Sequence, residues 1–221
     1  VATSLAVALA MAGKKVGLLD VDVHGPSVPK LLGLDGQELS MQGGEIVPVR
    51  VSENLSVVSI GFLLPSISDA VIWRGPRKFG AIQQFLSDVA WGRLDYLVVD
   101  SPPGTGDEPL AVAQLIGSPA KAVVVTTPQD VAVSDVRRCV SFCNTLSLPV
   151  AGIIENMSGL ICPHCGARVE LFKSGGGKAL ANEMKVPFLG QIPIDPEVVL
   201  AGDEGQAYMV NRRETPAGEA F

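Results

Sequence analysis

Short apolar runs alternate along the chain with segments of helical periodicity. The runs predict strands over residues 15–20, 47–51, 55–60, 96–100, 122–126, 150–154 and 188–192. Apolar residues spaced three and four apart predict helices over residues 1–12, 77–89, 131–148, 178–184 and 215–220. Continuous runs of Val, Ile and Leu are typical of parallel strands with both faces covered. The pattern therefore predicts an α/β fold, a doubly wound, mostly parallel sheet with helices on both faces.

Composition narrows the class of protein further. The chain has 221 residues, of which 47% are hydrophobic and 18% charged, with a net charge of −6. This is a globular composition, and we expect one domain over residues 1–221. The acidic balance argues against a nucleic-acid partner. The longest uncharged run, from Glu53 to Asp69, is too short and too polar to span a membrane, and no signal-peptide pattern opens the sequence. With no export signal and no disulfide pattern, we expect a cytoplasmic protein without a membrane partner.

Both ends of the sequence lie within or next to helical patterns. Val1 begins a helix without a preceding cap, and Phe221 directly follows a short helix that Thr215 caps. We therefore expect the chain to be a fragment that is truncated at both ends.

Acidic residues follow two of the predicted strands directly. Asp20 and Asp22 end the first strand, and Asp100 ends another strand and is followed by Gly104. A carboxylate at such a sheet edge can hold a hydrated Mg²⁺, and glycine lets backbone N–H groups approach a phosphate. Alternatively, each acid caps the turn that follows it. Two strand ends of this kind favour a ligand site at the carboxyl edge of the sheet.

These segments also carry a family resemblance. LLDVDVHGPS and DYLVVDSPPGTGD resemble the Mrp/ApbC branch of the deviant Walker A ATPases, which are relatives of MinD and ParA. The resemblance continues through WRGP, ENMSG, CPHCG, GGGKALA and VPFLGQIPIDP, and so covers nearly the whole chain. It implies a P-loop NTPase fold and a protein that hydrolyses ATP and carries iron–sulfur clusters to apoproteins.

One family motif is not in the sequence. The phosphate-binding loop KGGVGKS/T and the strand before it would precede Val1. We interpret this as truncation, and true loss in an inactive ATPase is the alternative. This chain alone is expected to bind ATP poorly, because that loop forms most of the phosphate cradle.

The resemblance also implies roles for single residues. Asp22 would position the attacking water, with Asp20 beside it, and Asp100 would hold Mg²⁺ through water. The remaining nucleotide positions are Gly104 for the γ-phosphate and, for adenine, Asn156, Pro193, Ile194 and Asp195. Without the resemblance, Asn156 would be interpreted as a turn residue after a strand.

The CPHCG segment is a candidate metal site. Cys162 and Cys165 can bind one metal centre, but a zinc ion or a cubane cluster needs four ligands. No second CxxC occurs in the sequence, so a twofold dimer is the simplest completion. The resemblance implies that these cysteines bridge a 4Fe–4S cluster between two subunits. A structural zinc ion and a redox pair remain open.

Two other segments have simpler interpretations. Residues 174–179 (SGGGKA) resemble a phosphate loop, but the spacing fails the template and we expect a loop that leads into a helix. Cys139 and Cys143 lie on the apolar stripe of a predicted helix, so we expect both in the core.

Three functions follow from these features. The favoured one is an ATP-hydrolysing homodimer that binds Mg²⁺ and ATP and assembles or transfers a 4Fe–4S cluster to apo iron–sulfur proteins. The alternatives are a positioning ATPase of the MinD/ParA kind, and a zinc-containing binding module with an inactive nucleotide site.

Overall fold

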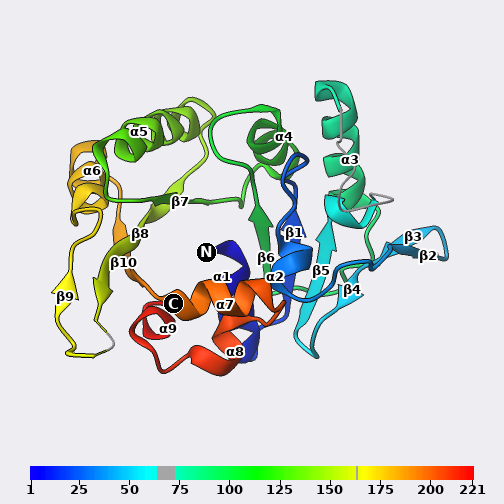
Figure 1. Ribbon diagram of the computed structural model, residues 1–221. Helices are drawn as coiled ribbons and strands as arrows, with labels where there is room; N and C mark the ends of the chain where they lie inside the picture. Colours follow the sequence, from blue (N-terminus) through cyan, green and yellow to red (C-terminus); the bar gives the residue numbers. More distant parts are fainter. Residues whose placement is uncertain (64–72, 163) are drawn as a thin grey trace. The chain divides into compact units, whose positions relative to one another are not determined.

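The computed structural model describes residues 1–63, 73–162 and 164–221 (Figure 1). The chain divides into two compact units. Unit 1 comprises residue 1, Ile116–Pro196 and Arg212–Phe221, and unit 2 comprises Ala2–Leu115 and Glu197–Asn211.

Unit 2 is built on a four-stranded sheet of order β4-β5-β1-β6. β1 (Val16–Asp20) lies between β5 (Leu55–Ser59) and β6 (Tyr96–Asp100) and is parallel to both, whereas β4 (Val49–Arg50) is antiparallel to β5. The register places Asp20 opposite Ser59 on one side and opposite Asp100 on the other. The two acids that end predicted strands therefore lie at the same level of the sheet.

Helices and a hairpin complete unit 2. They are α1 (Ala2–Met11), α2 (Val28–Leu31), η1 (Ile60–Leu63), α3 (Gly75–Ser87), α4 (Asp107–Ile116), α7 (Pro196–Asp203), α8 (Tyr208–Arg212), and the strands β2 (Ser40–Gln42) and β3 (Glu45–Val47). The core includes Leu19, Val58, Ile82 and Phe85, all fully or almost fully buried. Its burial holds β1 and β5 against α3.

Unit 1 contains a second parallel sheet, of order β10-β8-β7. Its elements are β7 (Ala122–Thr126), β8 (Val150–Ile161), β10 (Phe188–Ile194), the antiparallel β9 (Arg168–Val169), α5 (Asp130–Thr145), α6 (Gly176–Met184) and α9 (Pro216–Glu219). Helix α5 packs on β7 and α6 on β8. Val140 and Leu180 from these helices enclose Val124 and Ile153 of the sheet.

The α/β class and the mostly parallel strands are confirmed. In the described residues the parallel strands are divided between two sheets, one in each unit. β8 also extends beyond residue 154 to Ile161, where Leu160 and Ile161 pair with β9. The expected domain extent and truncation stay predictions. Among the described residues, no helix has the length and apolarity to cross a membrane.

Several short elements could not be predicted from the pattern of apolar residues. Helices α2, α4, α7 and α8 and the β2–β3 hairpin carry no periodic stripe long enough to predict. In α3 the apolar side chain of Phe79 is exposed, whereas its charged neighbour Lys78 is buried. The reason is a buried partner for the Lys78 ammonium group, described below. The predicted cap at Thr215 is confirmed, since its hydroxyl accepts from the backbone N–H of Gly218.

Candidate functional site

Asp20 organises the loop that follows β1. Its side chain is buried, and its carboxylate accepts hydrogen bonds from the Ser59 hydroxyl at 2.9 Å and the Asp22 backbone N–H at 3.1 Å. The backbone N–H of Val28, eight residues along, also donates to it at 3.3 Å. The carboxylate thus joins both ends of the loop to β5. This is a structural role for Asp20. The catalytic role of Asp20 stays a prediction.

Asp22 shapes the same loop from within. One carboxylate oxygen accepts from the backbone N–H groups of His24 and Gly25, at 3.1 and 3.0 Å. These bonds form a side-chain turn that fixes the half-buried carboxylate. Gly104, in the loop after β6, is exposed and has φ +93°, a conformation that favours glycine.

The acids of unit 2 make a strongly negative environment. Burial raises the pKa of Asp20 to about 7, since its hydrogen bonds offset burial only in part and the Asp100 charge adds to it. Burial also raises the pKa of Asp100, as does the charge of Asp22. Carboxylates in this state lower their energy by binding a cation, so the donor set fits a hydrated Mg²⁺.

A buried ion pair beside this loop was not predicted from the sequence. The Lys78 ammonium group donates to Glu108 at 2.7 Å and lies 2.9 Å from His24 Nε2. Lys78 and Glu108 are both buried, so the pair joins α3 to α4 and to the loop after β1. Lys78 precedes Ile82, Phe85 and Val89 at helical spacing, which is the signal that could have found it.

The predicted adenine positions come together in unit 1. Asn156 lies within β8 and is paired with Ile192 of β10, directly before Pro193. Ile194 ends β10 and Asp195 follows it. All four predicted positions are half-buried, three of them on the neighbouring strands β8 and β10 and Asp195 directly after β10. The alternative of a turn residue after a strand is wrong for Asn156, because the strand continues past it.

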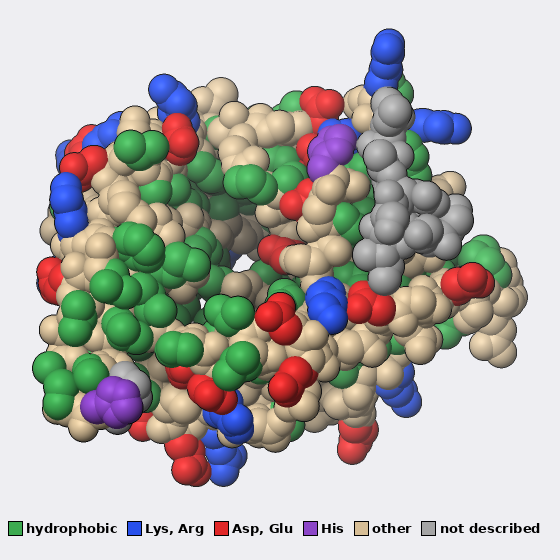
Figure 2. All heavy atoms as spheres, in the orientation of Figure 1, with side chains coloured by type: hydrophobic (Ala, Val, Ile, Leu, Met, Phe, Trp, Pro, Cys, Tyr) green, Lys and Arg blue, Asp and Glu red, His purple; other side chains and the backbone are tan. Residues whose placement is uncertain are grey.

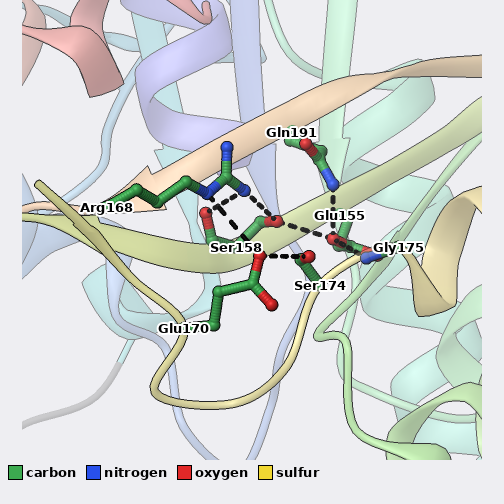
Figure 3. Close-up of polar contacts among 7 residues, drawn as sticks. All are labelled: Glu155, Ser158, Arg168, Glu170, Ser174, Gly175 and Gln191. Carbon is green, nitrogen blue, oxygen red and sulfur yellow. Dashed lines mark hydrogen bonds and ion pairs between the residues drawn. The ribbon is translucent and has the colours of Figure 1, made fainter.

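Glu155, next to Asn156, is the centre of a buried polar network (Figure 3). Its carboxylate accepts from the Ser158 hydroxyl at 2.6 Å, the Gln191 amide at 2.8 Å, and the backbone N–H groups of Gly175 at 2.9 Å and Gly177 at 2.6 Å. Burial alone would raise the pKa of Glu155, but these four donors outweigh it and hold the pKa below its ordinary value.

The same network explains the structure of the glycine-rich segment at residues 174–179. Gly175 has φ +86° and precedes α6, whose first N–H groups bind Glu155 rather than an external anion. A Cβ on Gly177 would lie 2.9 Å from the Thr126 methyl and 3.1 Å from Glu155 Cβ. The expected loop leading into a helix is confirmed, and the close side chains of Thr126 and Glu155 favour glycine at position 177.

The cysteine pair lies at the tip of the β8–β9 hairpin. The backbone N–H of Cys162 donates to the carbonyl of Ala167, and that of Gly166 donates to the carbonyl of Cys162, both at 2.9 Å. Cys162 is half-buried and Cys165 is exposed. The backbone N–H groups of His164 and Cys165 hold the pKa of Cys162 below its ordinary value. The turn thus favours a thiolate, the form that binds metal.

Within the described residues, no group of three or more His, Cys, Asp or Glu side chains is arranged to hold a metal ion. The role predicted for the cysteine pair in metal binding stays a prediction. By contrast, Cys143 is buried and Cys139 packs against the core of unit 1, which confirms the interpretation of both as core residues.

Exposed apolar side chains surround the cysteine hairpin. Figure 2 shows hydrophobic side chains gathered over the part of unit 1 where Figure 1 draws β8 and β10. Exposed members on and beside the hairpin strands are Met157, Val169, Leu171 and Phe172. An exposed apolar surface of this kind is typical of an interface.

The comparison with known families gives the class of protein, the P-loop NTPases. A family model described as "ParA: NUBPL iron-transfer P-loop NTPase" matches residues 1–221. The chain belongs to this family of iron-transfer P-loop NTPases, which confirms the resemblance found in its motifs.

Relatives and solved structures agree with this assignment. The chain is 49% identical over 225 residues to the cytosolic Fe-S cluster assembly factor NUBP2 of Bos taurus, covering 100% of this chain and 83% of the relative. A NUBP2 homologue from Nematostella vectensis is 48% identical over 224 residues, with the same shares covered.

Among solved structures, a nucleotide-binding protein from Archaeoglobus fulgidus in complex with ADP is 39% identical, with a TM-score of 0.80. The match covers 93% of this chain and 80% of that one. MinD from Pyrococcus horikoshii, complexed with Mg-ADP, has a TM-score of 0.68 at 21% identity over 100% of this chain and 85% of that one. At that identity the likeness shows the fold alone.

Proposed function

We propose that this protein is a cytoplasmic ATPase that binds a 4Fe–4S cluster as a homodimer and assembles or transfers it to apo iron–sulfur proteins. The observation that carries the proposal is the thiol pair of Cys162 and Cys165 at a hairpin tip, supplying two of the four ligands that a cluster needs. The cluster is cargo, and the NUBP2 relatives are named for its assembly.

The hairpin suits a cargo that must be bound and released. Backbone N–H groups stabilise the Cys162 thiolate, while Cys165 is exposed to a partner. A second copy related by a twofold axis would bring the same two thiolates to the same centre and complete a set of four. The exposed apolar side chains on the hairpin strands would be buried by that copy.

The acids of unit 2 support the proposal that the protein binds and hydrolyses ATP. Asp100 would hold the water shell of Mg²⁺, Asp22 would orient the attacking water, and Gly104 would bring its backbone N–H to the γ-phosphate. Mg²⁺ supplies charge neutralisation on the phosphate oxygens when it is bound. Asn156 offers an amide donor and acceptor for an adenine edge, beside Pro193, Ile194 and Asp195.

A zinc-binding module is the second candidate function. The same pair of thiolates would suit a structural zinc ion of four cysteines in a dimer. The two candidates differ in one observable, because only a cluster contains inorganic sulfide.

Anaerobic reconstitution of the 221-residue chain with iron and sulfide tests the proposal. We expect about two irons and two sulfides per chain, with sedimentation of the loaded protein as a dimer. The double variant Cys162→Ala, Cys165→Ala should bind no cluster and keep the far-ultraviolet circular dichroism of the fold. Cys139→Ser is the matched control, and should bind as the unaltered chain does.

Two results would contradict the cluster proposal. One is zinc bound without sulfide, which would make CPHCG a structural clip. The other is retention of iron by the double variant, which would place the metal elsewhere.

A further inference from the structure

The hydrogen bonds behind the cysteine hairpin link it to the buried Glu155. Among the described residues, the ladder between the hairpin strands β8 and β9 pairs Leu160 with Val169 and Ile161 with Arg168. So short a ladder leaves the orientation of an exposed tip weakly determined. Additional bonds at its base are therefore needed to hold the two thiols in one place.

Arg168 supplies such bonds. Its Nη2 donates to the backbone carbonyl of Ser158 at 3.1 Å and to the Ser158 hydroxyl oxygen at 3.3 Å (Figure 3). The Arg168 side chain of β9 thus binds β8 at Ser158, four residues before Cys162. Gly159 leaves room for it, because a Cβ there would lie 2.8 Å from Arg168 Nε.

Ser158 is itself held from the opposite side. Its buried hydroxyl donates to Glu155, whose other donors come from α6 and from Gln191 of β10. A second branch leads from Arg168 to Glu170 at 4.0 Å, and Glu170 accepts from the Ser174 hydroxyl at 2.6 Å. The returning strand is therefore connected to the sheet and to the start of α6.

We propose that Arg168 and Ser158 are positioning residues for the Cys162–Cys165 pair, and that Glu155 anchors them. This inference rests on the proposed function, since its purpose is to pre-organise the thiolates for a cluster. Groups that orient metal ligands affect metal affinity by roughly 10- to 100-fold when they are removed. The same strand carries Asn156 between Glu155 and Ser158, so the proposed adenine position and the thiol hairpin share one fixed element.

The test compares two exposed arginines of unit 1. Arg168→Gln removes the bonds to Ser158, whereas Arg137→Gln removes a bidentate pair with Glu183 between α5 and α6. Their side chains are 43% and 41% exposed, so both variants should fold. We expect Arg168→Gln to speed loss of the reconstituted cluster to an iron chelator by roughly 10-fold. Arg137→Gln should leave that rate unchanged.

A conservative variant separates positioning from loss of bulk. Arg168→Lys should stay within about three-fold of the unaltered rate, because both bonds to Ser158 come from one nitrogen that an ammonium group can replace. Ser158→Ala should speed cluster loss as Arg168→Gln does.

A metal-free measurement keeps the inference separate from the proposed function. Hydrogen exchange at the Cys162 and Gly166 amides reports whether the hairpin tip stays closed. We expect Arg168→Gln to speed this exchange and Arg137→Gln not to. If the unaltered chain binds no cluster, the proposed function fails while this measurement still tests the positioning. If exchange and cluster loss are unchanged in Arg168→Gln, the positioning role is wrong even though the cluster binds.

Discussion

Two buried carboxylates, one in each unit, respond to burial in opposite ways. Asp20 ends β1 and has its pKa raised to about 7, whereas Glu155 in β8 has its pKa held below its ordinary value. Both side chains are almost completely removed from solvent. The sign of the shift therefore depends on the groups around each carboxylate and not on burial itself.

The difference lies in the donors and in neighbouring charge. Glu155 accepts four hydrogen bonds of 2.6–2.9 Å, two of them from N–H groups at the start of α6, where the helix dipole favours an anion. Asp20 accepts three, the longest at 3.3 Å, and has Asp100 opposite it in the sheet. Glu155 is thus a structural anion, whereas burial and the Asp100 charge favour the protonated form of Asp20 and raise its pKa to about 7.

The largest expected effect is from Glu155→Ala, which removes the buried ionised carboxylate of unit 1. The substitution leaves two buried and two partly buried donors without their acceptor, and should cost unit 1 about 4 kcal/mol. Both tryptophans, Trp73 and Trp91, lie in unit 2, so hydrogen exchange in β8 and α6 is the suitable measurement. Stability due to Glu155 is present above its ordinary pKa of 4.5 and lost as pH falls below it. Unchanged exchange in the variant would contradict the role of Glu155 as an anchor.

Asp20→Asn tests whether the pKa of the buried carboxylate of unit 2 is raised. Between pH 3.8 and about 7 the folded chain holds a proton on Asp20 that the unfolded chain releases, so the free energy of unfolding falls as pH rises. The permanently neutral amide removes this dependence, and should stabilise unit 2 by about 3 kcal/mol at pH 8 while changing little at pH 4. Urea unfolding followed by tryptophan fluorescence, without added metal, measures it. Equal pH slopes for the two proteins would show that the pKa of Asp20 is not raised.

The smallest expected effects come from the two serines that donate to the carboxylates. Ser158→Ala removes a donor from an ionised group and should cost about 2 kcal/mol at pH 7. Ser59→Ala should cost about 1 kcal/mol at pH 5, where Asp20 is protonated, and more at pH 8. The two variants are compared by hydrogen exchange in their own units. A pH-independent cost for Ser59→Ala would contradict the titration of Asp20 near neutral pH.

The apolar runs were sufficient to predict the parallel strands and the longer helices. Continuous Val, Ile and Leu segments bury on both sides, and that requirement is visible in the residues themselves. The motifs at the strand ends similarly located Asp20, Asp22 and Asp100, because a carboxylate next to a buried strand is costly without a partner. Local patterns could not predict α2, α4 or the extension of β8, whose hydrogen bonds depend on segments far along the chain.

The sequence by itself determined the fold class and the family, and it predicted candidate site residues. Only the tertiary structure decided the state of those residues. Glu155 and Gly177 are 22 positions apart, and nothing local indicates that a carboxylate would occupy the start of α6. The buried Lys78 ammonium group has its partners, Glu108 and His24, in other segments of the chain. Residue types and their spacing follow from local chemistry, whereas pKa values and burial depend on which distant groups the folded chain brings within a few ångströms.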